Sequence, residues 1–275
     1  MLELFKDVLP GKWYYSLIER MLKKKAVSGY PDNTFKPEEL IKRAEVLSFI
    51  EKAQTHEYEL IPPLLPSVVT VRAKLKDGRT SLGSGIVLDK DGYIATNCHV
   101  VLDGLDPSQE INVILDSLPA NINAKVLYGD LGQDIAILKI AADSGLLMPV
   151  EFPDEPVKLL DKVFCIGNPL GFTDTVSAGI VSCSKRVIGG NEWIQTDAAI
   201  NPGNSGGGAF NVKGQFIGLP TFIIVWADEQ KTIPVSNIGF ISPYYKVAHV
   251  YQQAKSGKVA FAGEQVREIV FANLF

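Results

Sequence analysis

The sequence has few cysteines and few histidines, and their spacing excludes two kinds of site. Its 275 residues include three cysteines and three histidines. Cys98, Cys165 and Cys183 are too few and too scattered for a disulfide scaffold, and no C-x-x-C pair occurs. The histidines form no H-E-x-x-H pair. We therefore expect no disulfide framework, no zinc or other metal site, and no cofactor.

Long apolar runs and clustered basic residues are also missing. No apolar run approaches the ~18 residues that span a bilayer, so we expect no transmembrane segment. The N-terminal stretch "MLELFKDVLP" contains Glu3 and Asp7 and lacks the basic start and apolar centre of a secretory signal. Taken literally, this predicts a cytoplasmic chain or one whose true start is missing. The net charge of -4, with no basic stripe, excludes nucleic acid as a partner.

What is present suffices for a large packed core and a smaller module. Hydrophobic residues make up 46% of the chain and charged residues 21%. In residues 1–58, "KWYYSLIERML" has apolar residues at helical spacing: Trp13, Leu17 and Met21 beside Tyr14, Ile18 and Leu22. Pro37 then opens a second expected helix, "PEELIKRAEVLSFIEKA". We expect a small helical module over residues 1–58.

The rest of the chain has the residue pattern of an all-β domain. Residues 59–66 contain three prolines, which oppose a helix or a central strand and favour a stiff linker. From residue 67 to 257, about ten runs of strand length follow one another with hardly a helical stretch between them. This pattern predicts antiparallel barrels or a sandwich. "PYYKVAHVYQQAKSG" is expected to form one closing helix that stops at Gly257, and residues 258–275 a tail too short for a further domain.

One glycine-rich stretch stands out within the β-rich region. "NPGNSGGGA", residues 201–209, surrounds a single serine with four glycines and a proline, so the backbone bends sharply around Ser205. By itself this stretch has two interpretations: a hairpin loop with an incidental serine, or a bend that aims the Ser205 hydroxyl at a substrate.

Two residues upstream favour the second interpretation. "TNCHVV" places His99 at the end of a strand pair, and "GQDIAILKI" places Asp134 just before an apolar strand. A serine becomes a good nucleophile when a neutral imidazole takes its proton and a carboxylate orients that imidazole. Each residue alone could be structural, His99 as a buried histidine and Asp134 as a turn residue. Their order down a β-rich chain favours a catalytic set with Ser205.

A different hydrolase pattern also fits part of the sequence. Gly203, Ser205 and Gly207 match G-x-S-x-G, the nucleophile elbow of α/β-hydrolases, with Asp228 and His249 following in the required order. That elbow needs a strand before the serine and a helix after it. Here "GGGAFNVKGQFIGL" follows, a glycine run that enters a β-hairpin. An esterase of this kind stays open as a weaker alternative.

Four motifs in order resemble the HtrA/Deg family of trypsin-like serine proteases. They are "GSGIVLDKDGYIATNCHVV", "GQDIAILKI", "VFCIGNPLGFTDTVSAGIVS" and "QTDAAINPGNSGG", and the similarity extends from about residue 67 to residue 257. The resemblance implies a mainly β fold of two six-stranded barrels with the active site between them. It implies that His99 is the general base, Asp134 its orienting acid and Ser205 the nucleophile.

The same resemblance implies the surroundings of the reacting atoms. Backbone N–H groups of Gly203 and Ser205 would form the oxyanion hole, because glycine easily turns its N–H inward. The pocket floor would lie six residues before the nucleophile, at Ala199, and the pocket would also include Ile200, Leu219 and Pro220. An Ala floor, with no carboxylate, predicts cleavage after small or medium apolar residues.

The sequence also departs from the family pattern. Cys98 stands where the family usually has Asn, and Gly218-Leu219-Pro220-Thr221 replaces the common Gly-Ile-Asn-Thr. Pro220 has no N–H, so one backbone hydrogen bond to an extended substrate is expected to be missing. No PDZ domain is expected after Gly257.

The N-terminal region resembles one S-layer homology repeat, a module that binds cell-wall polysaccharide. "GYPDNTFKP" and "KRAE" carry the similarity. It implies a role for Arg43 in binding an anionic sugar, with a solvent-exposed pair to Glu39 as the alternative. Lys42 replaces the Thr that often precedes Arg-Ala.

These observations together predict a serine endopeptidase that cleaves unfolded or extended polypeptides and is attached to the cell envelope or lies outside the cell. The expected partners are polypeptide substrates, cell-wall polysaccharide at the N-terminal module, and a second copy of the chain in a homo-oligomer. Two alternatives remain from a different class: a catalytically silent protease-like binding protein, and a protein whose main role is wall attachment.

Overall fold

The structure is a computed structural model of the chain, and it divides into two compact units. It describes residues 5–23, 27–39, 61–103, 106–107, 110–115, 121–168, 174–227, 232–257 and 261–262. The smaller unit comprises Met1–Pro62 and the larger one Pro63–Phe275. Each unit has hydrophobic clusters of its own.

The smaller unit packs around one short helix, α1 (Tyr15–Lys23). Ile18 and Tyr14 are buried, and Leu22 packs against them, as expected for that helical stripe. Trp13 and Leu17 are 80% and 42% exposed, so the neighbouring stripe faces outward, contrary to the expectation of one shared face. The second expected helix lies mostly outside the described residues, and so does Arg43.

Asp7 holds the turn that follows α1 in the smaller unit. Its carboxylate accepts hydrogen bonds from the backbone N–H groups of Phe35 and Lys36, at 2.8 and 2.6 Å. Burial acts to raise the pKa of Asp7, but these two bonds lower it below its ordinary value. An aspartate of the quoted N-terminal stretch therefore anchors the "TFKP" end of the "GYPDNTFKP" motif.

A proline-rich 3₁₀ helix, Pro62–Ser67, starts at the last residue of the smaller unit and continues into the larger one. The sequence predicted a linker without helix here. Prolines are compatible with a short 3₁₀ helix because their fixed φ near −65° lies within its range, and the chain enters the first strand directly after it.

Six strands close into a first barrel. Their order is β7-β6-β1-β2-β3-β8, with β8 pairing back to β7. All six pairings are antiparallel, and the interior is filled mainly by Val, Ile, Leu and Ala side chains. The strands are β1 (Val68–Lys74), β2 (Thr80–Val87), β3 (Tyr93–Thr96), β6 (Glu110–Ile114), β7 (Asn121–Asp130) and β8 (Ile135–Ile140).

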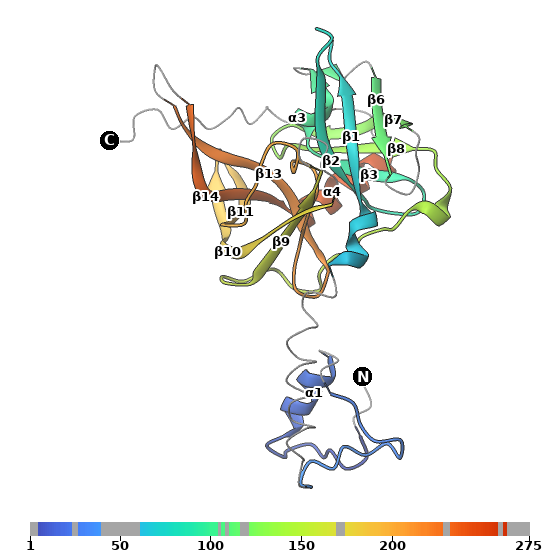
Figure 1. Cartoon of the computed structure of the whole chain (residues 1–275), viewed down its shortest axis with the longest axis vertical. Coiled ribbons are helices and arrows are strands. Elements are labelled where there is room, and N and C mark those ends of the chain that lie inside the picture. Colours follow the sequence, from blue (N-terminus) through green and yellow to red (C-terminus); the bar gives the residue numbers. More distant parts are fainter. Residues whose placement is uncertain are drawn as a thin grey trace. The chain divides into compact units, whose positions relative to one another are not determined.

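Six further strands close into a second barrel, in the order β10-β11-β14-β13-β12-β9. Figure 1 shows the two barrels as separate groups of strands within the larger unit. The prediction of two six-stranded barrels is confirmed. The strands are β9 (Lys162–Gly167), β10 (Thr175–Ile188), β11 (Asn191–Thr196), β12 (Gly208–Phe210), β13 (Phe216–Ala227) and β14 (Thr232–Pro243).

Small elements complete the larger unit. α3 (Cys98–Val101) follows β3, and the pair β4 (Leu102–Asp103) and β5 (Asp106–Pro107) follows α3. A second 3₁₀ turn spans Ser144–Leu146, and β15 (Phe261–Ala262) adds to β7 in parallel. α4 (Tyr244–Lys255) is the expected closing helix, and Gly257 follows it with φ +77°. α4 contacts β7 and β8 of the first barrel and β13 and β14 of the second.

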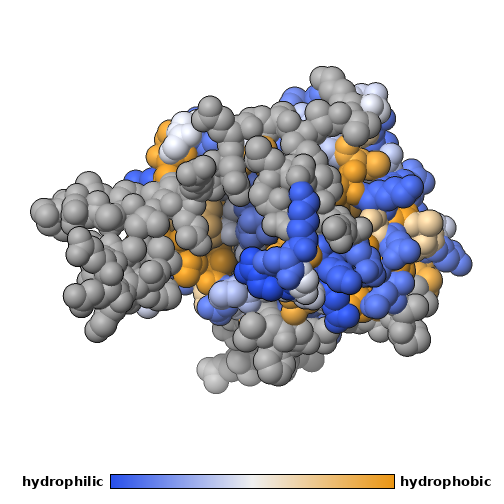
Figure 2. Space-filling model, turned by 90° about the horizontal axis from the view of Figure 1, so that it is seen from above, coloured by the Kyte–Doolittle hydropathy of each residue, from blue (hydrophilic) through white to orange (hydrophobic). Residues whose placement is uncertain are grey.

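Apolar residues at the surface are scattered. In the view of Figure 2 the described surface is mostly hydrophilic, with separate apolar areas. Exposed apolar side chains of the larger unit include Leu159, Leu160, Val176 and Val187. Within the described residues, no helix is both long enough and apolar enough to cross a membrane.

Candidate active site

His99 projects from α3, directly after the end of β3. The first N–H groups of a helix have no partner inside the helix, and the His99 N–H is one of them. It donates to Oδ1 of Asp134 at 2.9 Å. The Nδ1 atom of the ring lies 2.5 Å from Oδ2 of the same carboxylate. Asp134 therefore holds both the backbone and the ring of His99, the ring through its Nδ1 atom.

Asp134 sits in a tight turn directly before β8. Its φ is +53°, in the left-handed region that Asp tolerates better than most residues. The Asn97 side chain donates to the Asp134 carbonyl oxygen at 2.7 Å and fixes this turn. Asn97 occupies the N-cap position of α3, and its side chain makes no capping hydrogen bond. The Asp134 side chain is 16% exposed and that of His99 is 43% exposed.

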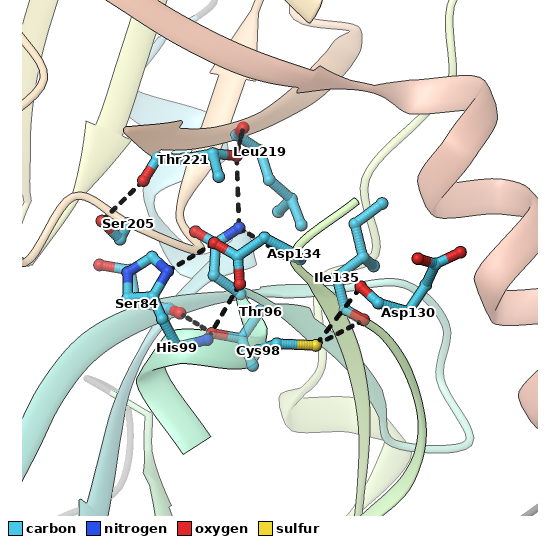
Figure 3. A network of polar contacts seen from close by, with 11 residues as sticks. Ser84, Thr96, Cys98, His99, Asp130, Asp134, Ile135, Ser205, Leu219 and Thr221 are labelled. Atoms are coloured by element: carbon cyan, nitrogen blue, oxygen red, sulfur yellow. Dashed lines mark hydrogen bonds and ion pairs between the residues drawn. The ribbon is translucent and has the colours of Figure 1, made fainter. Parts of the chain in front are cut away.

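Ser205 lies in the glycine-rich loop that precedes β12 in the second barrel. Its backbone carbonyl accepts a hydrogen bond from the N–H of Ser84, in the first barrel, at 2.9 Å. A Cβ on Gly206 would lie 2.3 Å from Oγ1 of Thr96 and 3.0 Å from the backbone nitrogen of Asn97. Only glycine at position 206 permits this close approach of the loop to Thr96 and Asn97. The approach brings Ser205 to the segment that carries His99. Figure 3 shows the His99 ring between Asp134 and Ser205 in that view.

The Ser205 hydroxyl contacts the backbone carbonyl of Thr221, on β13, at 3.4 Å. This distance is long for an O–H···O bond, so the hydroxyl is held weakly. The loop is tied to the same strand by the Gly206 N–H, which donates to the Pro220 carbonyl at 3.1 Å. The Asn97 amide also reaches this strand, at 3.3 Å from the Thr221 hydroxyl.

Two backbone N–H groups of this loop are available for an incoming group. Gly203 has φ +102°, a conformation open to glycine alone at little cost. Within the described part of the chain, neither the Gly203 N–H nor the Ser205 N–H donates to a backbone or side-chain acceptor. N–H groups without partners in a glycine-rich bend can bind a negatively charged oxygen.

The chain matches two protein families. Residues 83–219 match the trypsin-like peptidase domain, and residues 4–47 match the S-layer homology domain. It is 43% identical over 145 residues to "Probable periplasmic serine endoprotease DegP-like" of Brucella suis, covering 51% of this chain and 27% of that protein. It is 37% identical over 195 residues to the protein of that name from Pseudomonas fulva, covering 69% of this chain and 38% of that protein.

A solved structure with the same architecture is titled "HtrA-type protease AlgW with tripeptide". It aligns with a TM-score of 0.63 and 31% identity, covering 74% of this chain and 65% of that one. The chain belongs to the HtrA/Deg family of trypsin-like serine proteases. It spans 27% and 38% of the lengths of the two curated HtrA/Deg relatives named above.

The four residues expected to form the HtrA/Deg substrate pocket differ in accessibility. Ala199 is exposed, and its carbonyl accepts a hydrogen bond from the Ser177 hydroxyl at 2.7 Å. Ile200 is buried in the second barrel, where its Cδ1 atom would lie 2.6 Å from a Cβ on Gly239. Leu219 and Pro220 are buried in β13. Among these four residues, Ala199 alone presents its side chain to solvent.

A separate surface hollow lies away from these residues. It measures about 200 Å³ and is lined by residues 155–158, 161–162, 211–213 and 215. None of the expected catalytic or pocket residues lines it. A hollow that shares no residue with the His99–Asp134 pair contributes nothing to the site described here.

Cys98, which stands beside His99 where the HtrA/Deg family usually has Asn, is a packing residue. Its thiol donates to the Ile135 carbonyl with an Sγ···O distance of 3.1 Å. Burial raises the pKa of the Cys98 thiol well above its ordinary value, and the charges of Asp134 and Asp130 act in the same direction. A protonated, buried thiol is a poor nucleophile or metal ligand. All three cysteines are free, and no three His, Cys, Asp or Glu side chains cluster as a metal site in the described residues.

The α/β-hydrolase alternative fails on the fold. β12 follows the Ser205 loop, where the elbow would require a helix. His249 is exposed on α4, and Asp228 lies outside the described residues.

Ser84, Asn97 and Thr221 surround the site but were not predicted as part of it. Ser84 and Asn97 lie within the quoted motifs "GSGIVLD" and "TNCHVV", and Thr221 directly follows Pro220. Position in a motif was the only signal that could have identified them.

Proposed function

We propose that this chain is a serine endopeptidase that cleaves extended or unfolded polypeptides through His99, Asp134 and Ser205. The observation that carries the proposal is the double hold of Asp134 on His99, on its backbone N–H and on its ring Nδ1. This hold fixes one tautomer of the imidazole and directs Nε2 away from the carboxylate, as a general base requires. Membership of the HtrA/Deg family supports the same assignment.

In this proposal His99 takes the Ser205 proton while the serine oxygen bonds to the substrate carbonyl carbon. The carbonyl electron pair moves to oxygen, where the N–H groups of Gly203 and Ser205 stabilise the charge. Breaking the C–N bond releases the amine, which takes the proton from His99. A water molecule then attacks the acyl-enzyme in the same way, releases the new carboxylic acid, and restores the serine hydroxyl.

The direct test is peptide hydrolysis by the Ser205→Ala variant. Loss of the nucleophile is expected to reduce kcat on the order of a million-fold, with the melting temperature unchanged within about 2 °C. Ser256→Ala, at the exposed end of α4, is the matched control and should retain full activity. Casein cleavage by Ser205→Ala at a rate close to that of the wild type would reject the assignment.

A catalytically silent binding protein is the second candidate. It is favoured by the contact of the Ser205 hydroxyl with the Thr221 carbonyl. The hydroxyl has a single proton, and a proton donated to this carbonyl is not donated to His99. In this case neither the wild type nor Ser205→Ala hydrolyses casein, and both bind it equally.

We further propose attachment to the cell envelope through the N-terminal unit. The match of residues 4–47 to the S-layer homology domain supports this location, as does the word "periplasmic" in the names of the DegP-like relatives. The ligand would be an anionic wall polysaccharide, with Arg43 as a contact residue. A protein that serves mainly for wall attachment would bind the polymer and lack hydrolysis.

A further inference from the structure

Ser84 is a buried residue of β2 whose hydroxyl joins two segments of the second barrel. Its side chain is fully buried. The hydroxyl donates to the Gly203 carbonyl at 2.7 Å and accepts from the Asn168 N–H at 2.8 Å. A hydroxyl has one donor and can accept as well, so both of its functions are used here.

The backbone of Ser84 is fixed from both sides. Its N–H donates to the Ser205 carbonyl at 2.9 Å, and its carbonyl accepts from the Thr96 hydroxyl at 2.7 Å. Ser84 therefore touches the Ser205 loop at Gly203 and again at Ser205. It belongs to the first barrel, so these bonds join the two barrels at the nucleophile.

The approach of the two barrels depends on glycines around Ser84. A Cβ on Gly83 would lie 2.7 Å from the Val100 side chain and 3.2 Å from the Ser205 carbonyl oxygen. A Cβ on Gly167 would lie 2.8 Å from the Cα of Asn204 and 3.1 Å from the Ser84 hydroxyl. The absence of these two side chains lets the loop lie against β2 at hydrogen-bond distance.

The Gly203 carbonyl belongs to the peptide group between the two N–H groups assigned to the oxyanion hole. Gly203 at φ +102° has wide rotational freedom, and the N–H of that peptide, on Asn204, donates to the Asn201 carbonyl at 3.0 Å within the same loop. Preorganised donors are effective because they need no reorientation during the reaction. The buried Ser84 hydroxyl, bonded to the Gly203 carbonyl, adds a second restraint on this peptide that comes from the other barrel.

We propose that Ser84 is a positioning residue for the oxyanion hole: its hydroxyl fixes the Gly203–Asn204 peptide and so aims the N–H groups of Gly203 and Ser205. The inference rests on the proposed function and adds a residue that acts on the transition state through the loop, without touching the substrate.

The test compares Ser84→Ala with the wild type on a peptide substrate and on a valine peptide boronic acid. The boronate forms a tetrahedral adduct with serine and so reports on the oxyanion hole. We expect kcat to fall about 10- to 100-fold, since misplaced donors lose much of their effect, and KM to stay within about twofold. The boronate inhibition constant should rise by the same factor as kcat falls.

Thr70→Val is the matched control. The Thr70 hydroxyl accepts from the side chain of the same Asn168 at 2.7 Å, and Thr70 pairs with Ser84 between β1 and β2. It contacts no residue of the Ser205 loop by hydrogen bond within the described residues. We expect Thr70→Val to keep kcat and boronate affinity within about threefold of the wild type. An equal loss in both variants would overturn the inference, because a general loosening around Asn168 would explain it.

Two further outcomes separate the inference from the proposed function. An active wild type with an unchanged Ser84→Ala variant overturns the inference alone. A wild type that neither hydrolyses peptide nor binds the boronate overturns the proposed function and the inference with it.

If Ser84→Ala does not fold, Ser84→Cys replaces it, because a thiol is a weaker donor of similar shape. A threefold to tenfold loss of kcat and boronate affinity is then expected, and wild-type values overturn the inference.

Discussion

At the scale of single residues, the His99–Asp134 pair depends on a backbone conformation that most residues avoid. A left-handed φ costs an L-residue roughly 1–2 kcal/mol, and Asp134 adopts φ +53°. The cost is offset by the Asn97 bond to its carbonyl and by the two bonds from His99 to its carboxylate. Because the turn is fixed in this way, the carboxylate faces α3.

Ala199 gives a prediction about which residue precedes the cleaved bond. Its methyl group offers no charge, and a basic substrate side chain needs a carboxylate partner when it is desolvated. We expect Val, Ala or Leu at this substrate position to be preferred over Lys or Arg by at least about tenfold in kcat/KM. A peptide library differing only at that position measures the ratio.

The Ala199→Asp variant should gain cleavage after Lys and Arg, and Ala199→Ser is its uncharged control. Efficient wild-type cleavage after Lys or Arg would show that Ala199 does not form the pocket floor.

The sequence predicts three catalytic residues but not the side chains that surround them, for a physical reason. His99, Asp134 and Ser205 follow from chemistry and order. Ser84 bonds to Gly203 across 119 positions, and Asn97 to Thr221 across 124. Such contacts arise only when both barrels have closed, so no local pattern reports them. The positive φ of Asp134 also depends on a long-range contact, because Asn97, from another element, holds its turn.

At the scale of elements, α4 joins the two barrels and is anchored at its C-terminal half. The Tyr251 hydroxyl donates to the Asp89 carboxylate, and the Lys255 ammonium lies 3.6 Å from it. The other Asp89 oxygen accepts from the backbone N–H groups of Asp91 and Tyr93, which shapes the turn between β2 and β3. One carboxylate therefore organises the turn "DKDG", residues 89–92, and holds the closing helix.

Asp89 predicts an acid dependence of stability. Burial acts to raise the pKa of Asp89, but the Tyr251 bond, the two backbone bonds and the Lys255 charge lower it below its ordinary value. A lowered folded-state pKa stabilises the fold above the unfolded value near 3.8, and this stability is lost as pH falls through the folded value. Asp89→Asn keeps one acceptor for the turn and removes the acceptor for Tyr251.

At pH 7 we expect Asp89→Asn to lower stability by about 1 kcal/mol, a modest value because the carboxylate is partly exposed. The melting temperature should fall by about 2–4 °C, and the difference should shrink as the pH falls below the unfolded value near 3.8. Tyr251→Phe should lose a similar amount, and the double variant should lose less than the sum. Additive losses at pH 7 would show that the two side chains do not interact.

Most strands were predictable because hydrophobic runs of strand length mark them. β11 and β12 lack a hydrophobic run of strand length. β12 has only three residues, Gly208–Phe210, and is a strand solely because β9 and β13 lie on either side of it. β10 extends to Thr175–Ile188 because its polar end pairs with β11 through an irregular register. Pairing partners, which a single segment does not encode, set these bounds.

At the scale of the whole molecule, the chain combines a protease-type domain with one S-layer homology repeat. The fold class was predictable because ten β-rich runs without intervening helices leave few architectures. The exposure of Trp13, which precedes α1, and of Leu17 on α1 was not predictable, because helical periodicity gives two apolar stripes and does not say which one packs.

Wall attachment predicts weak, salt-sensitive retention of the full chain on purified anionic cell-wall polysaccharide. A single repeat lacks the avidity of linked modules, which can multiply affinity by ~10² to 10⁴. We expect Arg43→Ala to reduce the retained fraction, because it removes a guanidinium suited to a carboxylated sugar. Arg20→Ala, an exposed arginine of α1, is the matched control. Equal retention of both variants and the wild type would remove Arg43 from the binding site.

The central claim is that Ser205 is a nucleophile activated by His99. Its most direct measurement is covalent labelling by a fluorophosphonate probe, with the modified peptide located by mass spectrometry. The account predicts an adduct on Ser205 in the wild type, none in Ser205→Ala, and labelling slowed at least a thousandfold in His99→Ala, because the serine then lacks its base. A wild type without an adduct on Ser205, or a His99→Ala variant labelled at the wild-type rate, would contradict it.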